Sequence, residues 1–281
     1  MKKKKMKKVL LVAVLAVLIS TVTYAWFSVK NKAGVNNLAI SAGTEGNLLI
    51  ADDTGNGPAE YSSELDLRMI DGSYAECTLN PVTTIEGREF YAPVYSGGKV
   101  VNVKKITSEA ELTNKYIYEK QFYLKVENEG RGNDDEYYIY LTAHTGDKGT
   151  FMTDIAADDA NGDTAANAIR ISFTIDDETV IYEPNFDGDN YSNELAEDLV
   201  VSGGYNSYNT VKQIESGIFA DSNNGNDSEY LFKIPADTDK LVTMRVWIEG
   251  KDKDCANSIE LDKISGYIEF SSVSIRNATV N

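Results

Sequence analysis

Apolar and polar side chains alternate with a two-residue period through most of this chain, and this period decides the class of fold. In residues 118–126, Phe122, Leu124 and Val126 alternate with polar side chains, and residues 169–175 alternate in the same way. Successive side chains of a β-strand point to opposite faces of a sheet, so each such segment is predicted to be a strand with one buried face. Further segments of this character are 38–41, 47–51, 89–95, 100–106, 136–143, 179–182, 229–234, 241–249 and 266–275. Strands that follow one another without regular helices between them predict an all-β fold, an antiparallel β-sandwich or jelly roll.

Helical segments are few, and the connections between the strands are polar. Residues 108–114 begin with Ser108, a residue type favoured at helix N-caps, and residues 192–199 are predicted to form a second short helix. Loops rich in Gly, Asn and Asp are expected at 128–135, 156–167, 201–209 and 220–228. None of them has the composition of a domain linker, so residues 26–281 are predicted to form a single β-sandwich domain with long polar loops.

The first 27 residues differ from the rest of the chain. Six lysines precede a run without charged residues from Val9 to Phe27, which is the order of a signal peptide. The small residues of Thr23-Tyr24-Ala25 predict cleavage between Ala25 and Trp26. The same run is long enough to cross a bilayer as a helix and to stay as an anchor.

Both alternatives predict export through the cytoplasmic membrane. Residues 1–25 are a signal peptide or an anchor helix, which is handled by the export machinery and, if cleaved, by signal peptidase. Residues 1–27 are the part expected to contact the membrane. The rest is expected to be extracellular or at the cell surface, and membrane-anchored if residues 1–25 are retained.

The part that follows the leader is strongly acidic. The formal net charge of −17 becomes −23 once the six leader lysines are removed. A surface of this sign repels phosphate, which argues against nucleic acid as a partner. Acidity favours solubility at a crowded surface, and it is also compatible with binding of divalent cations.

Two cysteines, Cys77 and Cys255, lie far apart in the sequence. Export exposes thiols to oxidising conditions, so one long-range disulfide between these two is one interpretation of the sequence. Two buried free thiols fit the sequence as an alternative, because free cysteine packs as a small hydrophobic residue.

Little in the sequence points to catalysis. His144 is the single histidine, which excludes a site of several histidines and leaves one candidate for a catalytic triad. The residues after it, Thr145, Gly146 and Asp147, are typical of a turn after a strand. The sequence therefore favours a protein that is not an enzyme.

The best match to a metal-binding spacing is Glu183-x-Asn185-x-Asp187-Gly188-x5-Glu194. Oxygen ligands with a glycine at these places are the pattern of an EF-hand loop, which wraps Ca²⁺. Glu183 instead of Asp, Pro184 after it and a strand-like segment before it depart from that pattern. The two interpretations are a Ca²⁺ site at Glu183, Asn185, Asp187 and Glu194, and an ordinary acidic turn.

Aromatic residues allow two interpretations as well. The chain has 17 tyrosines, which are compatible with a carbohydrate-binding platform, but tyrosine is also common in strands, where the ring packs and the hydroxyl stays wet. Segment 241–249 is predicted to be a core strand and not a site. Its two faces carry Met244, Val246 and Ile248 on one side and Arg245, Trp247 and Glu249 on the other. If Trp247 is buried, a charge beside it is expected at a sheet margin that reaches water.

The N-terminal residues resemble those of a known group of exported proteins. Tyr24-Ala25-Trp26-Phe27-Ser28 follow the leader, and Val35-Asn36-Asn37-Leu38-Ala39-Ile40-Ser41-Ala42-Gly43-Thr44 come shortly afterwards. This arrangement resembles exported Firmicutes proteins with a SipW-dependent type of signal peptide, a group that includes the TasA and camelysin biofilm-fibre proteins. Segments 79–84, 89–91, 167–173 and 246–257 are similar to uncharacterised surface proteins of the same bacteria.

The resemblance implies a jelly-roll-like β-sandwich and a subunit of a biofilm matrix that polymerises by lending its N-terminal strand to a neighbour. Residues 35–41 alternate as such a strand needs in order to pair along a sheet edge, or as the first strand of their own domain does. The greater length, the two cysteines and Trp247-Ile248-Glu249-Gly250 depart from the fibre proteins.

These observations lead to a first hypothesis, a non-enzymatic cell-surface or extracellular-matrix protein that forms fibres. Its expected partners are copies of itself or other cell-surface proteins. The rival hypothesis is a glycan- or ligand-binding β-sandwich module displayed on the membrane. A third, a secreted hydrolase with paired carboxylates, has the least support.

Overall fold

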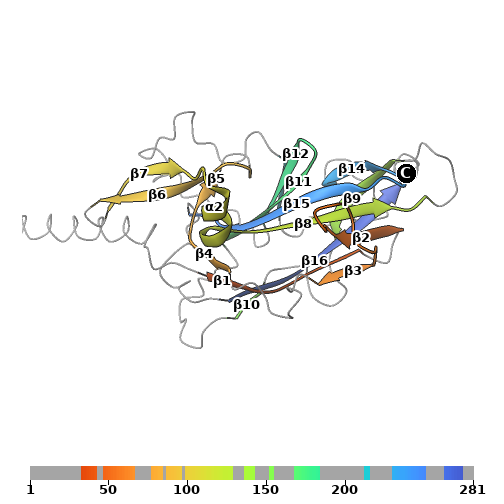
Figure 1. Cartoon of the computed structure of the whole chain (residues 1–281), viewed down its shortest axis with the longest axis horizontal. Helices are drawn as coiled ribbons and strands as arrows, with labels where there is room; N and C mark the ends of the chain where they lie inside the picture. Colours follow the sequence, from red (N-terminus) through yellow and green to blue (C-terminus); the bar gives the residue numbers. More distant parts are fainter. Residues whose placement is uncertain are drawn as a thin grey trace, which may run out of the picture.

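The computed structural model describes residues 33–42, 47–66, 77–84, 87–96, 99–128, 136–142, 152–154, 168–183, 212–215, 230–250 and 263–274. Most of these residues lie in strands of three sheets, with seven, six and three strands, and one short helix accompanies them (Figure 1). The described part is therefore all-β and mainly antiparallel, as predicted. Among these residues no helix combines the length and the apolarity that crossing a bilayer requires. The predicted leader, residues 1–25, lies outside them.

The seven-stranded sheet places the first described strand beside the last. Its order is β14-β9-β16-β1-β3, and β10 also pairs with β16, as β4 does with β1. β1 runs parallel to β16, with Gly34 opposite Lys263 and Ala42 opposite Phe270. The strands are β1 (Ala33–Ala42), β3 (Glu64–Asp66), β4 (Cys77–Leu79), β9 (Glu136–Thr142), β10 (Met152–Asp154), β14 (Phe232–Pro235) and β16 (Lys263–Ser274).

The six-stranded sheet has the order β13-β12-β11-β15-β8-β2. Its strands are β2 (Leu48–Asp52), β8 (Ile117–Val126), β11 (Ile169–Ile175), β12 (Glu178–Glu183), β13 (Lys212–Glu215) and β15 (Lys240–Ile248). The three central strands confirm the predicted segments to within about a residue. The parallel pairs, β12 with β13 and β1 with β16, depart from the predicted antiparallel arrangement. Neither pair is joined by a short hairpin turn, so the connection does not force the antiparallel direction.

A shared core lies between the two large sheets. Phe270 of β16 contacts Phe122 of β8 at 6.0 Å and Phe173 of β11 at 5.4 Å between ring centroids. The residues predicted to point inward, including Leu124 and Val126, are fully buried in the same cluster. Burial of each such side chain contributes roughly 1.5–3 kcal/mol. The alternation of the sequence thus becomes the inner face of each sheet.

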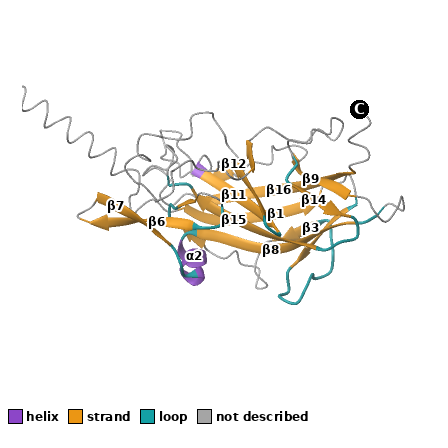
Figure 2. Cartoon of the chain, turned by 90° about the horizontal axis from the view of Figure 1, so that it is seen from above, coloured by secondary structure: helices purple, strands orange, loops and turns teal. Residues whose placement is uncertain are grey.

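The three-stranded sheet, with β5 (Thr83–Thr84), β6 (Phe90–Ser96) and β7 (Lys99–Lys105), lies at one end of the molecule next to helix α2 (Glu109–Lys115) (Figure 2). The hairpin β6–β7 projects beyond the large sheets. The helix predicted at 108–114 is confirmed: the Ser108 side chain caps it by accepting a hydrogen bond from the Glu111 N–H at 3.3 Å. The helix predicted at 192–199 and most of the predicted polar loops lie outside the described residues.

Candidate functional site

Strand β1 occupies an interior place in the seven-stranded sheet. β16 pairs with one side of it, while β4 pairs with residues 33–35 and β3 with residues 39–41 on the other side. The Ala42 N–H then donates to the Ser63 carbonyl at 2.8 Å. If β1 left this place, β16 on one side and β3 and β4 on the other would be left with unpaired edges that another strand of the same sequence can fill.

The six-stranded sheet has a second, outer face, which points away from the shared core. The small sheet and α2 cover one part of it, here named the covered half, around Trp247, Ile117, Ile181 and Arg170. The other part, the open half, presents Gln121 and Tyr123 of β8 and Leu241 and Thr243 of β15. On the outer face, β8 and β15 are therefore buried in the covered half and face solvent in the open half.

In the covered half, Trp247 is fully buried and meets the Phe90 ring edge-on at 5.3 Å. Its indole Nε1–H donates to Glu249 Oε2 at 3.2 Å. The expectation that a charge beside Trp247 reaches water is met by Arg245, whose side chain is partly exposed, whereas Glu249 is fully buried. The backbone is bridged at the same place: Val82 pairs with Glu249, and the Gly250 N–H donates to the Val82 carbonyl at 2.8 Å.

A turn before β6 lies flat on the covered half. The Gly87 carbonyl accepts a hydrogen bond from Ser172 Oγ at 3.3 Å, and its N–H donates to Thr84 Oγ1 at 2.9 Å. Arg88 Nε donates to Thr179 Oγ1 at 2.7 Å. Gly87 has φ +69°, and a Cβ there would come within 3.1 Å of Ser172 Cβ. Only glycine allows the backbone to approach the sheet so closely in this conformation.

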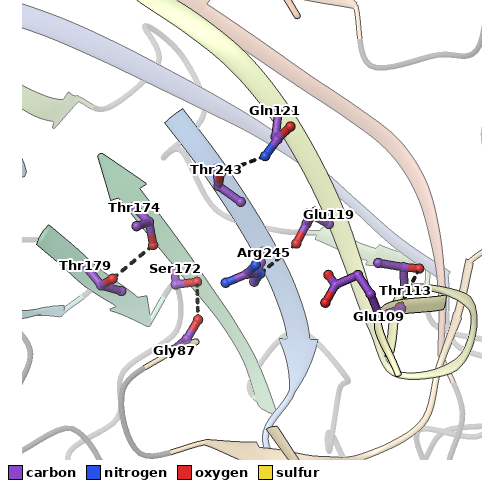
Figure 3. A network of polar contacts seen from close by, with 10 residues as sticks. All are labelled: Gly87, Glu109, Thr113, Glu119, Gln121, Ser172, Thr174, Thr179, Thr243 and Arg245. Atoms are coloured by element: carbon purple, nitrogen blue, oxygen red, sulfur yellow. Dashed lines mark hydrogen bonds and ion pairs between the residues drawn. The ribbon is translucent and has the colours of Figure 1, made fainter. Parts of the chain in front are cut away.

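Polar side chains bond across neighbouring strands from the edge of the covered half into the open half (Figure 3). Arg245 Nε donates to Glu119 Oε2 at 2.7 Å, and the two side chains are 19% and 20% exposed. Gln121 Nε2 donates to Thr243 Oγ1 at 3.2 Å. Both pairs are formed by residues directly opposite each other on β8 and β15, which is the arrangement that stabilises antiparallel strands.

The margin of the open half is formed by Tyr61. Its hydroxyl donates to Asp239 Oδ1 at 2.8 Å, and Lys125 Nζ lies 5.5 Å from the centre of its ring. Burial, followed by the hydrogen bond to Asp239, raises the pKa of Tyr61 above its ordinary value of 10.0. The raised pKa keeps the Tyr61 side chain a neutral phenol. Its ring is a second aromatic ring near Tyr123.

The described tyrosines differ in burial. Tyr137, Tyr138, Tyr140 and Tyr182 are buried within strands, which confirms the packing role for them. Burial raises the pKa of Tyr182 to about 12. Tyr61 and Tyr123 are half-buried instead, with Tyr123 on the open half and Tyr61 at its margin.

Most residues of the predicted sites lie outside the described part of the chain. Glu183 is the last residue of β12, while Asn185, Asp187 and Glu194 of the Ca²⁺ loop are not described. Cys77 begins β4, whereas Cys255, His144 and the cleavage residues Ala25 and Trp26 are outside. Within the described residues, no group of three His, Cys, Asp or Glu side chains is arranged to hold a metal ion. The Ca²⁺ site, the disulfide and the cleavage stay predictions.

The sequence did not indicate the row formed by Glu119, Gln121, Thr243 and Arg245. Its strands lie more than a hundred residues apart in the chain, and alternation assigns each side chain to a face but not to a partner strand. Searches for relatives do not identify it either: no protein-family model, no curated protein and no solved structure matches this chain.

Proposed function

We propose that this chain is a non-enzymatic, exported cell-surface or extracellular-matrix protein, folded as a jelly-roll-like β-sandwich, that assembles into fibres by donating β1 to the next copy. The observation that carries the proposal is the interior position of β1, paired on both sides, in a strand close to the N-terminal end of the chain. The lysine-rich leader and the resemblance to Firmicutes fibre proteins support the exported and matrix setting.

Exchange of β1 is energetically accessible because it replaces every backbone pairing with an identical one. A donated β1 would pair with the β16, β3 and β4 of the neighbour in the same register as in its own molecule. The donated and undonated states therefore differ chiefly at the hinge, the segment that connects β1 to the rest of its chain. That hinge is the connection between β1 and β2, residues 43–46, which lies outside the described residues. Its sequence, Gly43-Thr44-Glu45-Gly46, contains two glycines, a residue type that accepts many backbone conformations. Head-to-tail donation generates a filament when the rotation from one copy to the next does not close into a ring.

The partners that follow from this proposal are copies of the chain, the export machinery and signal peptidase, but not nucleic acid. Cleavage between Ala25 and Trp26 would release a free subunit. Retention of residues 1–25 would tether the chain to the membrane through residues 1–27. Mass spectrometry of the N-terminus of the protein from its native cells separates the two cases.

An engineered cysteine pair tests strand donation directly. Ser41 and Glu64 face each other on β1 and β3, next to the bonded pair of Ala42 and Ser63, so they take the closely spaced non-hydrogen-bonded position that suits a disulfide. Ser41→Cys/Glu64→Cys is made in a Cys77→Ser/Cys255→Ser background, allowed to assemble, and then oxidised. Donation predicts a ladder of covalent multimers on a non-reducing gel, because the thiol introduced in β1 of one copy then bonds the thiol introduced in β3 of the next.

Two controls make this result specific. Ser41→Cys alone should give no ladder, and reduction should collapse the ladder to monomer. A chain oxidised before assembly carries the bond within one molecule, and electron microscopy should then show no filaments. Quantitative intramolecular bonding in protein that has already formed filaments contradicts the proposal.

A further inference from the structure

The open half of the outer face keeps hydrogen-bonding capacity that the fold does not use. Arg245 bonds Glu119 only through Nε, and among the described residues no contact engages its two terminal nitrogens. Thr243 accepts from Gln121, so its own hydroxyl proton is left to donate. The Gln121 side-chain oxygen and the second oxygen of Glu119 are acceptors on the same row. Donors and acceptors thus alternate along two neighbouring strands.

An aromatic and aliphatic strip continues this row. Tyr123 lies two residues beyond Gln121 on β8, directly opposite Leu241 on β15. Leu241 is 37% exposed and is the one large exposed hydrophobic side chain among the described residues. From Arg245 to Leu241 the row spans roughly 13 Å along the strands, and its two strands lie about 5 Å apart. An elongated ligand with apolar faces and many hydroxyl groups fits a surface of this size and composition.

The charges of this region decide the class of ligand. Arg245 is balanced by Glu119 and Lys125 lies near Asp239, at 3.9 Å between Nζ and Oδ1, so the open half has little net charge of its own. The chain as a whole carries −17, and its field disfavours anionic ligands at this surface. The Arg245 guanidinium donates hydrogen bonds and the Glu119 carboxylate accepts them. Such a pair suits a ligand with adjacent hydroxyl groups, because each hydroxyl both donates and accepts.

We propose that the open half, formed by Tyr123, Gln121, Thr243, Leu241 and the Arg245–Glu119 pair, binds a neutral polysaccharide. The sugar rings pack on Tyr123 and Leu241, and their hydroxyls bond the polar row. The site lies on the six-stranded sheet, whereas strand donation involves the seven-stranded one, so the two proposals stand or fall separately. Glycan binding would attach the protein to the polysaccharide of a cell wall or matrix.

The test uses residues 26–281 with dextran and laminarin as neutral probes and polygalacturonate as an anionic one. Affinity electrophoresis measures how each polysaccharide in the gel retards the protein. Tyr123→Ala is expected to weaken binding of the preferred neutral glucan about tenfold. Gln121→Ala, at an exposed position, is expected to weaken it less and to keep the fold. Lys104→Ala, an exposed strand position on β7, is the matched control and should bind as the unaltered chain does.

The outcomes separate the alternatives. Retardation by a neutral glucan that falls in both variants, with their melting temperatures unchanged, supports the site. Preference for polygalacturonate, equal retardation of all variants, or no retardation by either glucan overturns it. Self-association that Tyr123→Ala abolishes, without any glycan binding, also overturns it and assigns the surface to a second copy of the chain. Repeating the measurement on the Ser41→Cys/Glu64→Cys variant, oxidised as a monomer, shows whether binding survives when strand donation is blocked.

Discussion

The covered and open halves of the outer face use the same strands in opposite ways. On β15, Trp247 lies under the three-stranded sheet with no exposed surface, whereas Thr243, four residues earlier on the same face, is half-buried and bonds its neighbour Gln121. The difference lies in what packs above each position, not in the strand. A sheet face can therefore contribute to the core at one end and face solvent at the other.

The largest expected effect comes from emptying the covered half. Trp247→Ala removes the ring that packs on Phe90 and leaves the Glu249 carboxylate without its indole donor, so it should lower the free energy of unfolding by about 3–5 kcal/mol. Chemical denaturation measures this. Thr243→Ala on the same face is the control and should stay within about 0.5 kcal/mol. Equal losses for the two variants would contradict the division of the face.

The contact between the turn and the sheet gives the second effect. Gly87→Ala should cost about 1–3 kcal/mol, because a left-handed backbone conformation is strained for alanine and the added Cβ crowds Ser172 and Thr179. Gly55→Ala provides the comparison, since Gly55 has φ +77° with no atom within 4 Å of a new Cβ. Its loss should be smaller, about 1 kcal/mol. Thermal melting of the two variants measures both losses of stability, and their difference isolates the cost of crowding the new Cβ against Ser172 and Thr179. This difference should vanish only if the turn does not contact the sheet.

The boundary between the halves is tested by a double-mutant cycle on Arg245 and Glu119. Because both side chains are partly shielded and closely paired, their coupling energy should be about 0.5–1 kcal/mol. The Lys115–Glu111 pair on α2, with side chains 57% and 46% exposed, serves as the reference cycle and should give about 0.3–0.5 kcal/mol. If the coupling energy of Arg245 and Glu119 were lower than that of Lys115 and Glu111, the covered half would not shield the first pair from solvent.

The smallest effect concerns pH and the edge of the three-stranded sheet. The ion pair with Lys105 lowers the pKa of Glu89 below its ordinary 4.5, and Glu89 in turn raises the pKa of Lys105 above 10.5. The stabilisation that this ion pair contributes to the folded state is therefore complete between pH 4.5 and pH 10.5, the ordinary pKa values of the two groups. It is lost as the pH falls through the folded-state pKa of Glu89, or rises through that of Lys105.

Both groups of this pair are exposed, so the change in stability is small. Melting temperatures of the unaltered chain and of Glu89→Gln should differ slightly near neutral pH and converge at acid pH. Glu111→Gln is measured alongside as an exposed control. A difference that grows on acidification would refute the assignment.

Alternation along the sequence was sufficient to predict the longer strands and their inner faces. Phe122, Leu124, Ile171 and Phe173 are buried where a two-residue period places them, and Ser108 begins the helix as its N-cap chemistry requires. Short strands such as β5 and β10 were missed, because two or three residues show no period. Alternation assigns Arg170 to the outer face correctly, yet its complete burial depends on the small sheet above it. Burial on an outer face is a property of packing between distant segments, which no local pattern contains.

The candidate site was less accessible to prediction than the fold. The sequence suggested tyrosines as a platform without indicating which ones, and only the arrangement of strands separates Tyr123 from the buried Tyr138 and Tyr140. The row from Glu119 to Arg245 likewise depends on a register between β8 and β15 that joins two distant segments. The sequence composition and spacing that suggested Ca²⁺ binding concern a loop in which only Glu183 is described.

The parallel pairing of β1 with β16 also bears on when the molecule can fold. Val35 lies opposite Ile264, so one side of β1 has no partner until almost the whole chain has been made. Contacts between such distant segments form slowly, because the closure of a long loop comes before any gain from pairing. The pairing of β1 with β16 thus delays the closing of the largest sheet, and under the proposed export from the N-terminus this sheet would close only on the far side of the membrane.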